Sequence, residues 1–72
     1  NNLRKYRKEK HLSQADLTIE LNLLGINLHK NDVYMIENNK RTVKDYELWG
    51  FIKVLNITFD DLFAGIENKL EN

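Results

Sequence analysis

Cysteine and proline are absent from the 72-residue sequence, and glycine occurs only three times. Without cysteine the chain forms no disulfide and no thiolate metal site, so its core must be stabilised by non-covalent packing. The missing proline and scarce glycine leave few signals for β-hairpins. No hydrophobic run approaches the ~18 residues of a membrane span, and nothing at the N-terminus reads as a signal peptide. We therefore expect no membrane partner and a cytoplasmic location.

Length sets a second limit. Seventy-two residues allow one domain with a modest core, and they are too few for a nucleotide-binding α/β enzyme or a barrel. Hydrophobic residues make up 42% of the chain, which is too many for a disordered segment.

The charges are balanced overall but unevenly distributed. Eleven basic side chains face eleven acidic ones, yet residues 1–44 hold nine basic and five acidic side chains, whereas residues 45–72 hold two basic and six acidic. Such a dipolar domain can present its positive half to a polyanion without being basic overall. A chance imbalance among solvated charges explains the composition equally well.

Apolar residues recur at helical spacing along the whole chain. The pattern predicts an all-α fold, a compact bundle of five short helices that forms one domain over residues 1–65 and leaves a polar tail at 66–72. The predicted helices cover residues 2–10, 13–22, 29–38 and 44–55, with a short last one from Thr58 to about Gly65. Their expected inward residues are Ala15, Leu17, Thr18, Leu21, Val33, Ile36, Leu48, Phe51, Ile52, Leu55 and Ile57.

Four positions carry helix start and stop signals. Ser13 with Asp16, and Thr58 with Asp61, have the spacing of capping boxes. Asn39 and Asn56 follow apolar stretches and are suited to the left-handed conformation that ends a helix.

The sequence gives little support for catalysis. Its single serine, Ser13, is better explained as a helix cap, and His11 and His29 lie eighteen positions apart, which matches no metal-ligand spacing. We expect no enzymatic activity, no metal and no cofactor.

Residues 12–41 instead suit the recognition of DNA. Two capped helices joined by a turn, the second with exposed polar side chains and followed by basic residues, form the arrangement that a major-groove reader needs. Three segments resemble the Xre/Cro-like helix-turn-helix family of phage and bacterial repressors: LRKYRKEKHLSQ at 3–14, V-x-x-IENNKR at 33–41, and LNIT at 55–58 followed by Leu62-Phe63. The resemblance covers about residues 3–63.

This resemblance implies a phage repressor-like DNA-binding domain that acts as a sequence-specific transcriptional regulator of the repressor type on double-stranded DNA. The third helix would read bases with the face opposite Val33 and Ile36. The alternative is that this face is an ordinary solvated helix surface that contacts no base. That face holds Lys30, Asn31, Tyr34, Met35 and Asn38. Asn31 is suited to adenine, Lys30 to guanine, and Tyr34 and Met35 to thymine methyl groups. Asp32 on the same helix is assigned either to capping or to a contact with cytosine.

Contacts with the DNA backbone follow from the same comparison. Gln14 resembles the family's phosphate-binding glutamine, and Lys40, Arg41 and Lys44 are candidate phosphate clamps, since positive charge there gains from counterion release. A solvated polar surface is again the alternative.

The resemblance also implies a partly buried ion pair between Arg7 and Glu37 that ties the first helix to the end of the third. This pair is structural, and removal of one partner should cost about 3–5 kcal/mol.

The chain departs from the family pattern in two ways. Asn39 and Asn56 stand where family members usually have glycine. The stretch from Gln14 to Glu37 is about five residues longer than usual, which places the excess at Leu23–Asn27. That longer turn would either tilt the third helix or expose Leu23, Leu24 and Ile26 as a small packing surface.

A single unit of this kind contacts few base pairs, so we expect a homodimer, at least on DNA. Leftover apolar residues place its surface in the acidic C-terminal half, at Phe59, Phe63 and Ile66, with Trp49 as a further candidate. Packing in the core is the alternative for these side chains. The competing function is a protein-interaction module, such as the antitoxin of a toxin pair or an adaptor. Binding of RNA or single strands ranks last because it needs exposed aromatic platforms.

Overall fold

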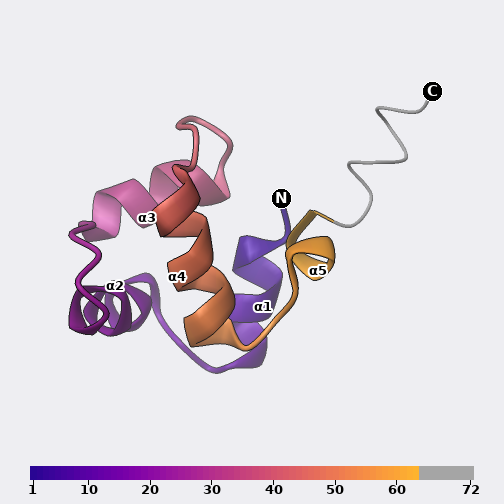
Figure 1. Cartoon of the computed structure of the whole chain (residues 1–72), viewed down its shortest axis with the longest axis horizontal. Coiled ribbons are helices and arrows are strands. Elements are labelled where there is room, and N and C mark those ends of the chain that lie inside the picture. The colour runs from indigo at the N-terminus through magenta and orange to yellow at the C-terminus, as the bar shows by residue number, and fades with distance from the viewer. Residues whose placement is uncertain (64–72) are drawn as a thin grey trace.

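The computed structural model describes residues 1–63, and these residues are all-helical, as the apolar spacing predicts (Figure 1). Five helices and no strand occur in this part of the chain. They are α1 (Leu3–Glu9), α2 (Gln14–Leu23), α3 (Lys30–Glu37), α4 (Asp45–Leu55) and α5 (Phe59–Phe63). The predicted domain end at residue 65, the tail 66–72 and Ile66 lie outside the described residues.

Both predicted capping boxes are confirmed. Asp16 N–H donates to Ser13 Oγ at 2.9 Å, and Ser13 N–H donates back to the Asp16 carboxylate at 3.0 Å. Thr58 and Asp61 repeat the exchange at 3.0 Å in both directions. Because each box satisfies two backbone N–H groups at a helix start, these residues determine where the short helices begin.

The predicted left-handed asparagines are confirmed as well. Asn39 has φ of 56° and Asn56 has φ of 54°, so each turns the chain out of a helix without glycine. His11 adopts the same conformation, with φ of 58°, in the connection between α1 and α2, which was not predicted.

The core lies between α2, α3 and α4, and Figure 1 shows α4 crossing the middle of the bundle. Helix α2 packs against α3 and α4, and α1 packs against α4. Phe51 and Leu55 of α4 are fully buried among side chains from the other helices. The other buried apolar residues are Leu3, Leu17, Leu21, Ile26, Leu28, Val33, Ile36 and Leu62.

Two expectations about the inward faces are wrong. Ala15 is exposed, because the inner stripe of α2 runs through Leu17 and Leu21 alone. Thr18 is only half-buried, and its hydroxyl donates to the Gln14 carbonyl at 2.8 Å, a local bond that satisfies the group without a core position.

The connection between α2 and α3 is built into the core. Ile26 is 4% exposed and belongs to the core, so it is not part of the packing surface that was the alternative to a tilted third helix, whereas Leu23 is 76% exposed. Gly50 on α4 makes room for Ile26, because a Cβ at position 50 would collide with Ile26 Cδ1. The missing side chain therefore sets how closely the connection approaches α4.

Asn22 holds this connection in place from the end of α2. Its Nδ2 group lies 3.2 Å from the Ile26 carbonyl and 3.0 Å from the Leu28 carbonyl, and it also donates to the Thr18 carbonyl. One side chain thus satisfies backbone acceptors on both sides of the turn. The connection is an ordered part of the fold whose backbone is bonded back to α2.

Candidate nucleic-acid interface

The outer face of α3 shares one hollow with the start of α2. Gln14, Lys30, Asn31 and Tyr34 line this hollow, which has a volume of about 420 Å³. Lys30, Asn31 and Tyr34 are exposed, while Val33 on the opposite face is fully buried. Four of the sequence-predicted DNA-binding residues are therefore neighbours on one surface.

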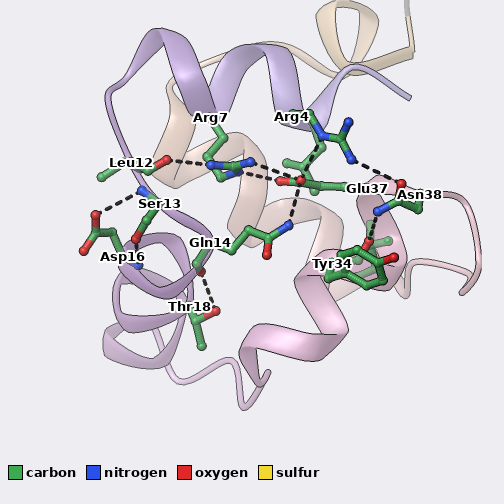
Figure 2. A network of polar contacts seen from close by, with 12 residues as sticks. Arg4, Arg7, Leu12, Ser13, Gln14, Asp16, Thr18, Tyr34, Glu37 and Asn38 are labelled. Carbon is green, nitrogen blue, oxygen red and sulfur yellow. Dashed lines mark hydrogen bonds and ion pairs between the residues drawn. The ribbon is translucent and has the colours of Figure 1, made fainter.

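Glu37, at the end of α3, is the centre of a buried polar network (Figure 2). Its side chain is 0% exposed. Arg7 Nε donates to Glu37 Oε2 at 2.6 Å, and Arg7 Nη2 lies 3.2 Å from Oε1. Arg7 Nη1 donates to the Leu12 carbonyl at 2.8 Å. The Arg7–Glu37 ion pair is thus present and links α1, the α1–α2 connection and α3.

Two further donors reach the same carboxylate. Gln14 Nε2 lies 3.1 Å from Glu37 Oε1, and Arg4 Nε lies 3.5 Å from it. Burial alone would raise the pKa of Glu37, but the bonds from Arg7 and Gln14 and the charge of Arg7 together hold the pKa below its ordinary value. The carboxylate is therefore ionised wherever the domain is folded near neutral pH.

Gln14 has a structural contact that the sequence did not indicate. Its amide nitrogen bonds to Glu37, so the side chain ties the first turn of α2 to the last turn of α3. The side-chain oxygen has no part in this bond. The geometry places Gln14 at the edge of the hollow as a bridge between the two helices.

Asn38 is the predicted base-reading residue that is most engaged within the protein. Its Nδ2 donates to the Tyr34 carbonyl at 2.8 Å, and its Oδ1 accepts from Arg4 at 3.2 Å. A contact with a base would have to use the second N–H or the second lone pair of this amide in the orientation that these bonds fix. Asn31, in contrast, makes only a weak 3.5 Å contact with the sulfur of Met35, which is half-buried.

Arg41 forms a bidentate ion pair with Glu47 that is not among the sequence predictions. Arg41 Nη1 and Nη2 each lie 2.9 Å from one oxygen of Glu47, whose side chain is 1% exposed. Lys44 N–H donates to the same carboxylate at 3.0 Å. The bonds from Arg41 lower the pKa of Glu47, against the opposing effect of burial, and Glu47 raises the pKa of Arg41. A carboxylate three residues after Lys44 was the available signal, since that spacing marks a helix cap.

Asp32 caps its own helix. His29 N–H donates to Asp32 Oδ2 at 2.9 Å, and Arg41 Nε lies 3.8 Å from Oδ1. The two contacts give both oxygens of the Asp32 carboxylate a partner within the protein. They favour capping over a contact with cytosine.

The remaining cations among the predicted DNA contacts are Lys30, Lys40 and Lys44. Lys30 and Lys44 are exposed, and Lys40 Nζ lies 5.6 Å from the centroid of the Tyr34 ring. This last distance is within the range of a cation–π contact, which holds Lys40 beside α3. Three ammonium groups thus come from the start of α3, the connection after it and the start of α4.

Other site types find no support in the described part of the chain. Residues 1–63 contain no group of three side chains placed to hold a metal ion, and no helix among them has both the length and the hydropathy to cross a bilayer. Comparisons with protein-family models, curated proteins and solved structures find no match to this chain.

Proposed function

We propose that the chain is a sequence-specific binder of double-stranded DNA, in which α2 and α3 form a helix-turn-helix unit of the phage repressor type and α3 enters the major groove. The observation that carries the proposal is the hollow in which Lys30, Asn31 and Tyr34 of α3 lie beside Gln14 at the start of α2. The resemblance of residues 3–63 to Xre/Cro-like repressors supports the same assignment. A regulatory role, of the repressor type, follows from that resemblance.

Asn31 and Lys30 are the base-reading side chains in this proposal. The amide of Asn31 offers a donor and an acceptor to adenine, and Lys30 offers a donor to guanine. Tyr34 adds apolar contact with a thymine methyl group. Each good polar pair discriminates against a wrong base by about 1–3 kcal/mol, so two of them suffice for a short preferred sequence.

Lys40 and Lys44 would hold phosphates on either side of the groove. Arg41, bound to Glu47, supports this surface by fixing the connection between α3 and α4. Gln14 and Asn38 hold the C-terminal end of α3 against α2 and α1. The proposal therefore separates residues that touch DNA from residues that position them.

Selection from a random duplex pool tests the proposal most directly. An enriched sequence is the expected result, and an inverted repeat would add that two copies bind together. Lys30→Ala should change the enriched sequence, whereas Lys8→Ala, which removes an exposed charge from α1, should leave it unchanged. The logarithm of affinity should fall with the logarithm of salt concentration, with a slope of about −0.9 for each phosphate contact, and Lys40→Ala should reduce that slope by about one contact. Absence of any enriched sequence would refute the proposal.

A protein-interaction module is the second candidate, and a specific observation favours it. Gln14, Asn38 and Arg41, three of the nine predicted DNA contacts, already bond to groups within the protein. In that case duplex DNA should bind weakly and without sequence preference even at low salt. An antitoxin or adaptor role would then be sought by identifying the bound protein.

A further inference from the structure

Helices α2 and α4 border a second hollow that shares no residue with the first. It has a volume of about 490 Å³ and is lined by Glu20, Leu23, Leu24, Trp49, Lys53 and Val54. Leu23 is 76% exposed, Leu24 41% and Trp49 49%. Gln14 and Leu23 stand at opposite ends of α2, roughly 14 Å apart along its axis. A partner seated here would leave the candidate nucleic-acid face open.

The apolar surface extends beyond the hollow along both helices. Ile19, four residues before Leu23, is 58% exposed, and Tyr46, three residues before Trp49, is 55% exposed. Residues three or four positions apart lie on the same side of a helix, so both continue the surface around the hollow. Exposed tryptophan, tyrosine and leucine in one continuous area are typical of protein interfaces, in which buried aromatic side chains supply much of the binding energy.

The surface carries one acidic and one basic side chain, so its charges are complementary to those of the same surface on a second copy. Glu20 stands on the α2 wall and Lys53 on the α4 wall, and within residues 1–63 they do not pair with each other. Lys53 Nζ lies 6.0 Å from the centroid of the Trp49 ring. In a two-fold contact the same patch meets itself, so an axis through the hollow would bring Glu20 of each copy toward Lys53 of the other. The patch then carries no excess charge to repel its own copy.

We propose that this surface, composed of Ile19, Glu20, Leu23, Leu24, Tyr46, Trp49, Lys53 and Val54, binds a second copy of the chain as a two-fold dimer. A stable interface needs ~800 Å² from each partner, and the hollow supplies its apolar centre while Glu20 and Lys53 supply its rim. The proposal requires no DNA. It also moves the expected dimer surface away from α5, because Trp49 lines the hollow with Leu23 and Leu24, whereas Phe59 packs on Phe63 with ring centroids 4.8 Å apart.

Sedimentation equilibrium of the full chain, without DNA, tests the dimer. The expected result is a monomer–dimer equilibrium that Leu23→Asp shifts to monomer by at least ~100-fold in Kd, because one apolar contact is lost in each half of the interface and two carboxylates are buried near each other. Leu23 is mostly exposed, so this variant should keep the parent's circular dichroism spectrum. Phe59→Asp, a matched change on α5, should leave the Kd within about threefold of the parent.

Charge exchange tests the arrangement within the dimer. Glu20→Lys and Lys53→Glu should each weaken the dimer by about tenfold, because each change sets like charges opposite each other. The double variant should return the Kd to within about threefold of the parent. A chain that stays monomeric at all concentrations would overturn the proposal, and so would a dimer disrupted by Phe59→Asp but not by Leu23→Asp, or a double variant without recovery. Since DNA is absent throughout, these results stand apart from the selection experiment.

Discussion

Replacement of Arg7 by alanine should remove most of the stability of the domain. Arg7 makes two bonds to Glu37, at 2.6 and 3.2 Å, and one to the Leu12 carbonyl at 2.8 Å. Removing one member of a buried ion pair costs about 3–5 kcal/mol, because the other charge remains buried. Gln14 and Arg4 still reach Glu37, which favours the lower end, near ~3 kcal/mol. The unpaired Leu12 carbonyl adds about 1 kcal/mol.

That loss approaches the entire stability expected of a core this small, about 3–5 kcal/mol. Urea unfolding followed by far-ultraviolet circular dichroism should therefore show Arg7→Ala with its midpoint shifted to very low urea at neutral pH, while enough folded protein remains in water to determine its unfolding free energy. A double replacement, Arg7→Met with Glu37→Leu, should recover most of the loss, because no buried charge is left without a partner. An Arg7→Ala variant that unfolds within 1 kcal/mol of the parent would refute the reasoning about this network.

The pH dependence of the unfolding free energy separates the loss of the ion pair from the loss of packing. In the parent the pKa of Glu37 is below its ordinary value of 4.5, so the pair stabilises the fold above that pH and the stabilisation is lost as the pH falls through the lowered pKa. Without Arg7, burial acts against fewer opposing bonds, so the pKa of Glu37 rises. The difference in unfolding free energy between parent and variant should therefore be largest near neutral pH and shrink as Glu37 becomes protonated. A difference independent of pH would show that lost packing, and not charge, is responsible.

Three further measurements test other parts of the fold. Ile26→Ala should cost about 2–5 kcal/mol in urea unfolding because it empties a buried site, whereas Asn27→Ala, at an exposed position in the same connection, should change stability by less than about 0.5 kcal/mol. Asn56→Ala should lower stability by about 1 kcal/mol and Asn56→Gly should leave it nearly unchanged, since only the alanine is strained at φ of 54°; equal effects would contradict the assigned conformation. Glu47→Gln should cost about 1.5–3 kcal/mol at neutral pH, and because the pKa of Glu47 is lowered by Arg41, that cost should decrease below pH 4.5, as unfolding across a pH series would show.

Local signals in the sequence predict much of this fold. The two capping boxes depend on residues three positions apart, and the left-handed turns depend on single asparagines, so neither requires knowledge of the tertiary structure. The inner stripes of α3 and α4 likewise follow from spacing, because Val33, Ile36, Phe51 and Leu55 repeat at helical intervals.

Contacts between distant segments could not be read in the same way. The sequence leaves a surface position for Ile26 open, because the site that accepts Ile26 exists only where Gly50, twenty-four positions later, leaves a space. The charge of Arg41 and its place after the third helix predict a phosphate contact, whereas its bidentate bond to Glu47 depends on how the connection before α4 turns. Exposed base-reading candidates such as Asn31 follow from helical spacing once the buried face is known. The bond of Gln14 to Glu37 instead requires the position of α2 relative to α3, and the bond of Asn38 to Arg4 requires the position of α1 relative to α3.

Positions 26 and 50 share a single volume. Ile26 occupies the space that a side chain at position 50 of α4 would need, so neither residue can be replaced by a larger one independently. A larger residue at position 50 requires a smaller one at position 26. The effects of the two substitutions on the free energy of unfolding should therefore be non-additive when combined. In related chains, a larger residue at the helical position is expected to accompany a smaller one, or a shorter connection, at the other.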